Sequence, residues 1–391
     1  MLNIAIIGVG NISRLHIEAI QLFKDKANIV ALVDITPEVA HKKNTDYNLG
    51  AQVFESHQAL LDSGLTIDLV HICTPPYTHA PIAIDCMDAG MNVLVEKPMA
   101  TCLKECDDML AAEKRNGVTL GVIAQNRFRD SVFRLKKITD SGIAGKIRAA
   151  HVNSFWWRGR VYYDLWWRGT WEKEGGGPTL NHAVHHIDML NWLQGEMPQE
   201  VTSVLTNVMH DNSEVEDLSF ATLKYADNAV ASITSSVIHH GEEQGIELQF
   251  EHAKVASPFA VRANHAKGNG FPEENQPLVD QITAFHDETP ALHHEGHPGQ
   301  IEDMLDALTH NRPPAITGQD GKNTIELITA IYKAGFLKRT ITLPITQEDD
   351  YYTFEGILNN APRFYEKQES KDMLSEEAIT VGTYLKGSKR A

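Results

Sequence analysis

Lys97 is the first residue whose type and position suggest chemistry. It lies in the triplet Glu96-Lys97-Pro98, directly after an apolar run, Asn92–Val95, that predicts a buried strand. An ammonium at the carboxyl edge of a sheet can be partly desolvated, so a lysine there can transfer a proton or stabilise an alkoxide. The alternative interpretation is a turn with a solvated ion pair.

A histidine-rich segment, GGGPTLNHAVHHIDMLNWLQG, spans residues 175–195, and its flanking glycines predict a single helix. At about 3.6 residues per turn, Asn181, His185 and Asp188 fall in one sector of that helix. The other faces are mostly apolar, so the helix is expected to be buried, where a polar strip needs partners or a function. His186 lies on an adjacent face. Because no EXXH or HEXXH arrangement occurs here, we expect no metal site.

These side chains need a scaffold, and the start of the chain supplies a recognisable one. The β-branched run Ile4–Ile7 is typical of a strand buried on both faces. Gly8, Gly10 and Ser13 follow at the spacing of a dinucleotide fingerprint. Gly8 permits a tight turn, and Gly10 lets the backbone approach a pyrophosphate without a Cβ in between. An ordinary strand-to-helix turn is the alternative.

The surroundings of the glycines favour the cofactor interpretation. A helix opens near Asn11 and Ile12, and its first N–H groups and positive dipole end are expected to face the phosphates. A second strand, Ile29–Val33, then ends in Asp34. An acidic residue about 20 positions beyond the glycines is placed to accept hydrogen bonds from the adenosine ribose.

The choice of cofactor follows from the residues around Asp34. No arginine follows it that could pair with a 2′-phosphate, so NAD is favoured over NADP. Lys42 and Lys43 are the cations nearest in sequence on that side, and we interpret them as part of a solvated helix face.

Up to residue 125 the chain alternates strands and helices, which predicts an α/β fold with a doubly wound parallel sheet. Besides the first strand, we expect strands at Ile29–Val33, Gln52–Phe54, Leu69–Cys73, Asn92–Val95 and Thr119–Ile123. The loop after Leu69–Cys73 carries Thr74, Pro75 and His79. It would lie where a ligand binds at the switch point of such a sheet, so these residues are predicted cofactor contacts.

A second domain is predicted from residue 126 to 345, beginning with a short helix (Val132–Ile138) and a strand (Lys146–Phe155). The segment FWWRGRVYYDLWWRGTWEKEGGG then gathers aromatic and arginine residues. Aromatic faces and guanidinium groups suit a sugar ring and its hydroxyl or phosphate groups, although packing over the sheet explains them equally well. Predicted substrate contacts are Arg168, Tyr163, Trp171 and His186.

The remainder of this domain reads as an α+β unit. Strands are expected at Val201–Val208, Leu218–Lys224, Val230–Val237 and Ile246–Phe250, as antiparallel neighbours with a hairpin turn at Asp227-Asn228. Residues 258–298 are expected to form a loop with exposed histidines at 293, 294 and 297. Two helices follow, Gln300–Thr309 and Gly321–Leu337. Residues 346–391 are predicted to be a surface tail with one short helix.

Composition narrows the functional classes. The 391 residues carry a formal net charge of −17, which argues against nucleic acid or an anionic membrane as a partner. No apolar run approaches the roughly 20 residues that span a bilayer, and the N-terminus lacks the features of a signal peptide. The four cysteines show neither metal nor disulfide spacing, so a cytoplasmic location is expected.

Together these motifs resemble the glucose–fructose oxidoreductase / inositol dehydrogenase / rhizopine-catabolism (Gfo/Idh/MocA) family over about residues 1–345. The residues that carry the resemblance are GVGNIS, Asp34, CTPPYTH, EKP, QNRF at 125–128, GGGPTLNHAVHHIDML, GHPGQIEDMLDAL and RPPAITGQDG. The resemblance implies a Rossmann domain followed by a domain with a large, mostly antiparallel open sheet used in oligomerisation. It also implies that Lys97 and His185 are the catalytic pair, and that Asp34, Glu96 and Asn126 contact the cofactor.

One departure narrows the substrate. Cyclitol dehydrogenases of the family usually carry Asp at the position of Asn181, whereas Asn resembles the branch that acts on nucleotide-linked or N-acetylated sugars. We therefore expect an NAD-dependent dehydrogenase that oxidises a secondary hydroxyl of a sugar, sugar derivative or nucleotide sugar. His185 would take the hydroxyl proton, Lys97 would stabilise the alkoxide, and Asn181 would orient the substrate or the imidazole.

Two rival functions remain open at this point. Some relatives are NAD-dependent glycosidases that oxidise their substrate transiently, and these form no net NADH. Others are non-catalytic regulators that bind a dinucleotide, although such a binder needs neither Lys97 nor His185. The expected partners are a small polyol or sugar and a second copy of the chain, in a homodimer or homotetramer.

Overall fold

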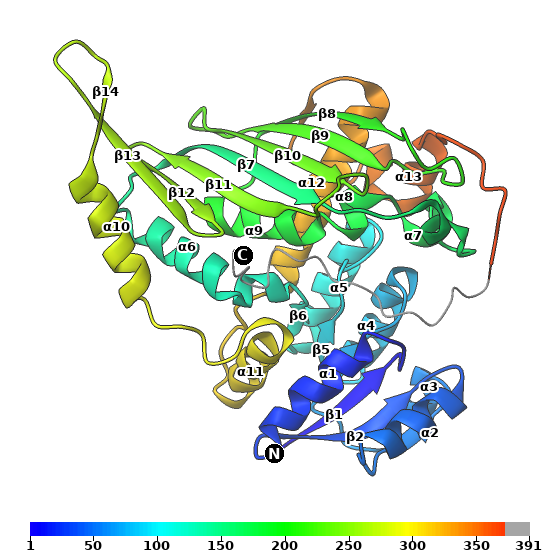
Figure 1. Ribbon diagram of the computed structural model, residues 1–391. Coiled ribbons are helices and arrows are strands. Elements are labelled where there is room, and N and C mark those ends of the chain that lie inside the picture. Colours follow the sequence, from blue (N-terminus) through cyan, green and yellow to red (C-terminus); the bar gives the residue numbers. More distant parts are fainter. Residues whose placement is uncertain (372–391) are drawn as a thin grey trace. The chain divides into compact units, whose positions relative to one another are not determined.

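The computed structural model describes residues 1–371, which divide into two compact units (Figure 1). The first unit comprises Met1–Phe128 and Leu292–Ile325, and the second comprises Arg129–Ala291 and the chain from Glu326 onwards. The second domain was predicted to be continuous from residue 126 to 345. In the structure, residues 292–325 belong to the first unit instead. The predicted tail, residues 346–391, is described only up to residue 371.

The first unit is built on a six-stranded sheet with the order β3-β2-β1-β4-β5-β6, and every neighbouring pair is parallel. The strands are β1 (Leu2–Ile7), β2 (Ala27–Val33), β3 (Gln52–Phe54), β4 (Leu69–Ile72), β5 (Asn92–Val95) and β6 (Leu120–Val122). The intervening helices are α1 (Ser13–Ile20), α2 (Pro37–Asp46), α3 (His57–Asp62), α4 (His79–Asp88) and α5 (Leu103–Asn116). The predicted doubly wound sheet is confirmed.

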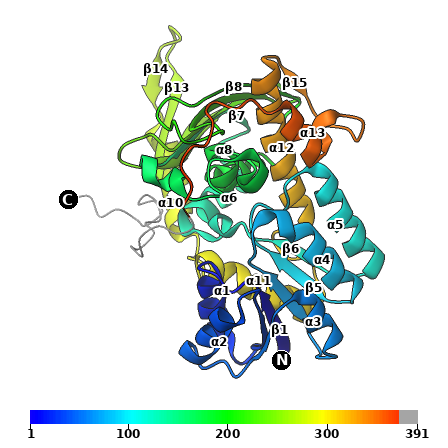
Figure 2. The same ribbon diagram turned by 90° about the vertical axis from the view of Figure 1, so that its right-hand side faces the viewer.

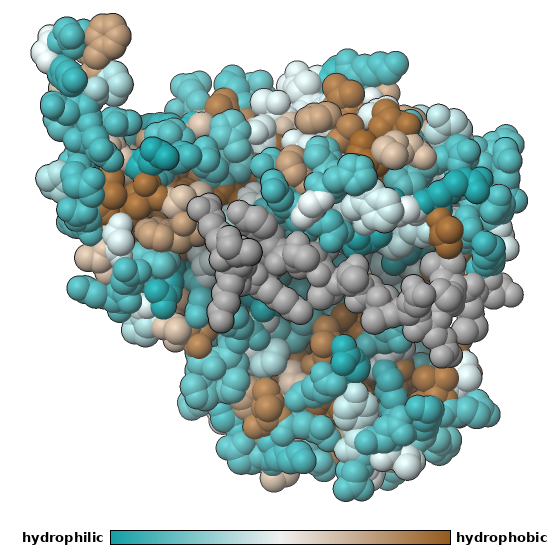
Figure 3. Space-filling model, viewed as in Figure 1, coloured by the Kyte–Doolittle hydropathy of each residue, from teal (hydrophilic) through white to brown (hydrophobic). Residues whose placement is uncertain are grey.

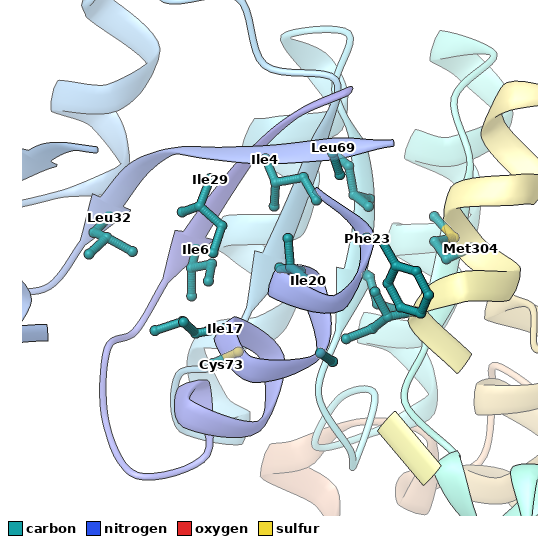
Figure 4. Packing of buried hydrophobic residues seen from close by; sticks show 14 of the residues in the cluster. Ile4, Ile6, Ile17, Ile20, Phe23, Ile29, Leu32, Leu69, Cys73 and Met304 are labelled. Atoms are coloured by element: carbon teal, nitrogen blue, oxygen red, sulfur yellow. The ribbon is translucent and has the colours of Figure 1, made fainter. Parts of the chain in front are cut away.

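Apolar residues from both the beginning and the later part of the chain form the core of this unit (Figure 4). Ile4 and Ile6 of β1 pack with Ile17 of α1, and Met304 arrives from α11 (Gly296–Thr309). A parallel strand covered on both faces must be apolar on both, which explains the uninterrupted run in β1. Because α11 packs in this core, residues 292–325 belong to the first unit.

The strand order reverses between β1 and β4, which are hydrogen-bonded neighbours. In open α/β sheets a ligand binds outside the carboxyl ends of the strands at such a switch point. The loops that follow β1, β4 and β5 therefore border the expected cofactor site.

The second unit contains a nine-stranded sheet with the order β14-β13-β12-β11-β7-β10-β9-β8-β15. Its strands are β7 (Ile147–Phe155), β8 (Glu200–Thr206), β9 (Leu218–Lys224), β10 (Val230–Ser236), β11 (Gln244–Phe250), β12 (Ala253–Ser257), β13 (Ala260–Ala266), β14 (Pro272–Glu274) and β15 (Ile341–Thr342). All neighbouring pairs are antiparallel except β7 and β10. A large, mostly antiparallel sheet was predicted and is confirmed.

Two expectations for this unit were wrong. Strands β10 and β11 are not neighbours, because β7 lies between them and pairs with both. Residues 258–298 are not a loop, since they contain β13, β14 and α10 (Gln276–Glu288). β13 is largely exposed and carries polar residues, so it lacks the apolar alternation that reveals a strand.

Helices cover one face of the large sheet (Figures 1 and 2). They include α6 (Asp130–Ser141), α8 (Pro178–Asn181) and α9 (Val184–Gln194). The other face is open, and along β9 buried and exposed residues alternate strictly. Val204 and Phe220 pair across β8 and β9 and are both more than half exposed.

The remaining elements of the described chain are α7 (Trp171–Glu174), α12 (Gly318–Leu337) and α13 (Phe354–Asn360), with short 3-10 turns such as η3 (Gln125–Phe128). Helix α12 starts in the first unit and ends in the second. None of the helices among residues 1–371 is long and apolar enough to cross a membrane. Hydrophilic residues cover most of the face seen in Figure 3, as the high net charge leads one to expect.

Candidate active site

The turn after β1 has the geometry that the glycine fingerprint predicts. Gly8 has a φ of +87°, and a Cβ there would lie 2.8 Å from the carbonyl oxygen of Cys73, so only glycine fits between β1 and β4. A Cβ on Gly10, in contrast, would meet nothing within 4 Å. Asn11 and Ile12 lie in the turn before α1, which begins at Ser13. The turn therefore leaves open space beside Gly10, as the approach of a pyrophosphate requires.

Asp34 follows β2 and is fixed against the same turn. One carboxylate oxygen accepts a hydrogen bond from the Val9 N–H at 2.8 Å, and the other accepts one from the Thr36 N–H at 2.9 Å. The side chain is half-buried. A carboxylate oxygen can accept more than one hydrogen bond, so Asp34 retains the capacity to bind ribose hydroxyls. This placement fits NAD.

Lys43 does not lie on a solvated helix face, contrary to the expectation. Its ammonium reaches from α2 to the glycine turn, donating hydrogen bonds to the Gly10 carbonyl oxygen and, at 2.8 Å, to Ser13 Oγ. Burial lowers the pKa of this ammonium. Lys42, the adjacent residue, is exposed and pairs with Asp46 at 2.8 Å.

Two further loops meet the carboxyl edge of the sheet, after β4 and β5. Thr74 is half-buried and Pro75 is exposed, so both residues are accessible to a ligand. His79 is completely buried, and its ring nitrogens lie 2.8 Å from the carbonyl oxygens of Pro98 and Thr74. The ring thus joins the two loops, and the contact of His79 with the cofactor stays a prediction.

Lys97 is half-buried and directly follows the buried Glu96. The Glu96 carboxylate turns into the protein, where Oε1 faces His16 and His297 and Oε2 accepts a hydrogen bond from the Lys97 N–H at 3.1 Å. Burial opposes this charge, but hydrogen bonds from the two imidazoles hold the pKa of Glu96 well below its usual value. The carboxylate therefore has internal partners, and the contact of Glu96 with the cofactor stays a prediction. Asn126 is buried in η3.

His297 is another correction. It was expected to be an exposed loop residue, yet its side chain is 8% exposed at the start of α11. Sequence alone could not reveal its partner Glu96, because about two hundred residues separate them. His293, by comparison, is exposed as expected.

In the second unit, glycines 175–177 form a turn that packs against a buried carboxylate. A Cβ on Gly177 would lie 2.0 Å from the Glu216 carbonyl oxygen. The Glu216 side chain accepts hydrogen bonds from the N–H groups of Gly177 and Thr179 and from the Tyr332 hydroxyl, each at 3.1 Å. Burial raises the pKa of Glu216 to about 7. This residue, which sequence reasoning missed, holds the N-terminus of α8.

The predicted single helix over this segment is interrupted at residues 182–183, so Asn181 ends α8 while His185 and Asp188 belong to α9. The Asn181 amide donates a hydrogen bond to the Gly176 carbonyl oxygen at 2.7 Å, which ties its side chain to the glycine turn. Within the run Val184–Leu190, His185 alone has a partly exposed side chain. An imidazole accessible on an otherwise buried helix suits a residue that meets a ligand.

Of the four predicted substrate contacts, Arg168 is half-buried and the other three are buried. Arg168 lies over the Tyr162 ring at 4.2 Å and pairs with Glu174 at 2.6 Å. Tyr163 is instead buried against His210, Trp171 is buried against Tyr332 and Phe336, and His186 is buried beside a small cavity lined in part by Ser131 and Met189.

Tyr162, the neighbour of Tyr163, lies beside two arginine side chains and a histidine ring. Arg158 and Arg168 both lie over its ring, and the rings of Tyr162 and Trp156 both lie near His182. Adjacent residues of an irregular segment commonly face opposite sides, so the sequence indicated the segment but did not distinguish Tyr162 from Tyr163. We call these five residues, Trp156, Arg158, Tyr162, Arg168 and His182, the aromatic–arginine cluster.

Comparison with known proteins gives a consistent picture. The family model described as an oxidoreductase family with an NAD-binding Rossmann fold matches residues 2–124, and that of the GFO/IDH/MocA C-terminal domain matches residues 132–256. The WlbA dehydrogenase of Bordetella pertussis, solved with NADH and UDP-GlcNAcA, is 30% identical with a TM-score of 0.76, covering 88% of this chain and 98% of that one.

Two curated relatives are more distant. The 2,7-anhydro-N-acetylneuraminate hydratase of Mediterraneibacter gnavus is 24% identical, over 87% of this chain and 96% of the relative. The myo-inositol 2-dehydrogenase of Thermotoga maritima is 23% identical, over 88% of this chain and 98% of the relative. The relatives therefore share an architecture but differ in the reactions for which they are named.

Proposed function

The chain belongs to the GFO/IDH/MocA family of NAD-binding oxidoreductases, and we propose that it oxidises a secondary hydroxyl of an acidic, N-acetylated sugar linked to a nucleotide. The observation that carries the proposal is the fixed pair of cofactor determinants, the open turn at Gly10 and the Asp34 carboxylate beside it. The half-buried Lys97 follows β5 at the same edge of that sheet.

The roles of the side chains follow from their chemistry. When bound, NAD supplies the acceptor for the hydride of the substrate carbon. His185 takes the hydroxyl proton as general base, and Lys97 donates a hydrogen bond to the same oxygen and stabilises its developing negative charge. Asn181, which the Gly176 carbonyl oxygen holds, orients the substrate. Lys97 and His185 belong to different units, so their joint action is part of the proposal.

Three observations support the class of substrate. The WlbA relative was solved with UDP-GlcNAcA, and the Mediterraneibacter gnavus relative is named for an N-acetylneuraminate derivative. The aromatic–arginine cluster of the second unit offers two guanidinium groups and two aromatic rings. Guanidinium forks recognise carboxylates and phosphates, and aromatic faces suit the C–H face of a sugar.

The test is NADH formation by the full-length protein with NAD⁺ and a panel of sugars, cyclitols and nucleotide sugars. UDP-GlcNAcA is expected to react fastest, and Arg168→Met is expected to raise its KM more than it changes kcat, because Arg168 would bind and not react. Faster oxidation of an unmodified cyclitol such as myo-inositol would reject the substrate class.

A second function is favoured by the hydratase relative. In this alternative the substrate is oxidised only transiently and the hydride is returned, so no net NADH forms. Product formation from 2,7-anhydro-N-acetylneuraminate without accumulation of NADH would support it. Lys97 and His185 would serve the same proton transfers in either reaction.

A further inference from the structure

Three histidines surround the Glu96 carboxylate inside the first unit. His16 Nδ1 lies 2.8 Å from His71 Nδ1, His16 Nε2 lies 3.0 Å from Glu96 Oε1, and His297 Nε2 lies 3.4 Å from the same oxygen. The exposed fractions are 0% for His16 and His71, 4% for Glu96 and 8% for His297. The four residues come from α1, β4, the end of β5 and α11, which makes the group a junction of the unit.

The positions of the protons follow from the partners. If His71 donates through Nδ1 to His16 Nδ1, then His16 carries its proton on Nε2 and donates to Glu96, while His297 donates through its own Nε2. All three imidazoles are then neutral, in agreement with burial, which lowers the pKa of His16 and of His71. The reverse direction would turn the His16 Nε2 lone pair toward the carboxylate unless the ring were charged.

This arrangement leaves one buried atom without a hydrogen-bond partner among the described residues, His71 Nε2, which would be a bare acceptor. The Glu96 carboxylate in turn accepts hydrogen bonds at both of its oxygens. It receives two imidazole N–H groups at Oε1 and the Lys97 N–H at Oε2, the last at 3.1 Å. A carboxylate held by imidazoles from α1 and α11 and bonded to the Lys97 N–H fixes the backbone at the position where Lys97 begins.

From this geometry we propose that His16 and His297 are positioning residues for Lys97 and act through the Glu96 carboxylate. The proposal rests on the proposed function, in which the Lys97 ammonium meets the reacting oxygen. Neither imidazole touches a reactant. Each instead keeps Glu96 ionised and oriented, and Glu96 keeps the Lys97 backbone in place. A displacement of about 1 Å at a reacting group can cost on the order of 100-fold in rate, so the positioning has a measurable consequence.

The competing interpretation is a metal centre. His16, Glu96 and His297 offer three ligand atoms within 4.8 Å of one another, which is a donor set that zinc accepts. The two interpretations differ in the protons. A hydrogen-bonded network keeps an N–H on Nε2 of both His16 and His297, whereas a metal would displace both protons.

The first experiment needs no substrate. Nitrogen NMR of histidine-labelled, full-length protein at neutral pH is expected to show His71 protonated at Nδ1, and His16 and His297 protonated at Nε2, all three neutral. Each resonance is assigned by its loss in the His71→Gln, His16→Gln or His297→Gln variant. A charged His16 ring, or zinc that copurifies and removes the Nε2 protons, would overturn the proposal.

The second experiment is a double-mutant cycle with Lys97→Met, measured as kcat on the fastest substrate of the panel. His297→Leu and His16→Leu remove the donor, and each is expected to lower kcat roughly 10- to 100-fold while NAD affinity stays within about twofold. His297→Gln keeps an N–H donor of similar reach and is expected to restore most of the rate. In the Lys97→Met background the Leu variants are expected to have no further effect.

The outcomes separate the two hypotheses. Full activity of Lys97→Met would refute the proposed role of Lys97. A slowed Lys97→Met together with unaffected His16→Leu and His297→Leu would refute only the positioning role, and so would losses that multiply in the double variants. His293→Leu, an exposed neighbour of His297, is the matched control and is expected to behave as wild type. If the Leu variants fail to fold, the kcat values of the Gln variants and the histidine tautomers measured by NMR test the positioning role.

Discussion

Asp34 Oδ2 accepts a hydrogen bond from the Val9 N–H at 2.8 Å, so the carboxylate that ends β2 is held against the glycine turn that ends β1. This bond fixes a negative charge at the position where we expect the adenosine ribose to bind. A 2′-phosphate would meet that charge, and like-charge contacts of this kind cost several kcal/mol.

We therefore expect NAD to bind at least about tenfold more tightly than NADP, a difference of about 1.4 kcal/mol or more. Asp34→Asn keeps an oxygen acceptor for Val9 but removes the charge, so it should raise NADP affinity with little change in melting temperature. Direct titration of both cofactors measures this. Equal affinities in the wild-type protein would refute the assignment.

Lys43 gives a second prediction for the same site. Its ammonium lies at the turn that is expected to cradle the pyrophosphate, so Lys43→Met should weaken NAD and NADP alike. Lys42→Met, which removes an exposed lysine paired with Asp46, is the control and should bind normally. The same cofactor titrations measure both variants. If both bind NAD as the wild type does, Lys43 only braces the turn.

Gly8 and Gly10 should fail in different ways when changed to alanine. Gly8→Ala combines a φ of +87° with a Cβ 2.8 Å from Cys73, so it should destabilise the protein by about 1–3 kcal/mol or more. Gly10→Ala meets no atom within 4 Å, so it should fold normally and lose NAD affinity. Thermal unfolding and NAD titration separate the two effects. A Gly10→Ala variant with full affinity would show that the cofactor does not approach there.

Features that depend on residues close together in the sequence were predicted correctly, whereas features that depend on distant residues were missed. The strands of the first unit were predictable, because most are apolar runs bounded by their own turns, and Asp34 follows its strand directly. His297 was not, because its burial depends on Glu96 and on the return of α11.

In the second unit, local signals failed for similar reasons. The largely exposed strand β13 has only the short apolar pair Val261 and Ala263 on one face, which is too little to reveal a strand from sequence. The order of residues 156–171 does not show which aromatic rings lie beside the arginines. In the structure Tyr162 lies under Arg168, whereas Tyr163 lies against His210. The helix that carries Asn181 was predicted as continuous, although it breaks after that residue.

Glu216 predicts a pH dependence of stability. Burial raises its pKa to about 7 in the folded protein, above the usual value of about 4.3 for the unfolded chain. Between these values the folded state binds more protons, so the contribution of this group to the unfolding free energy falls as pH rises from about 4 to about 7. Denaturant unfolding of wild type and Glu216→Gln across this range isolates the slope. Parallel curves would show that Glu216 titrates normally.

His185 and its neighbour His186 provide the sharpest test of the proposed mechanism, because they differ in exposure and not in type. His185 is partly exposed on α9, whereas His186 is 1% exposed and burial lowers its pKa to about 4. His185→Asn should stay folded and bind NAD, while turnover falls by roughly 10²–10⁴ through loss of the general base. His186→Asn should lower the melting temperature but leave turnover per folded molecule unchanged.

The pH profile distinguishes a base from a structural histidine. Oxidation by the wild type should rise with pH through a group that titrates in the histidine range, since a neutral imidazole is needed to accept the hydroxyl proton. That limb should vanish in His185→Asn and persist in His186→Asn. Single-turnover NADH formation across pH, with melting temperature as the folding control, measures it. If His185→Asn keeps the wild-type limb, another group is the base, and Lys97 is the next residue to test.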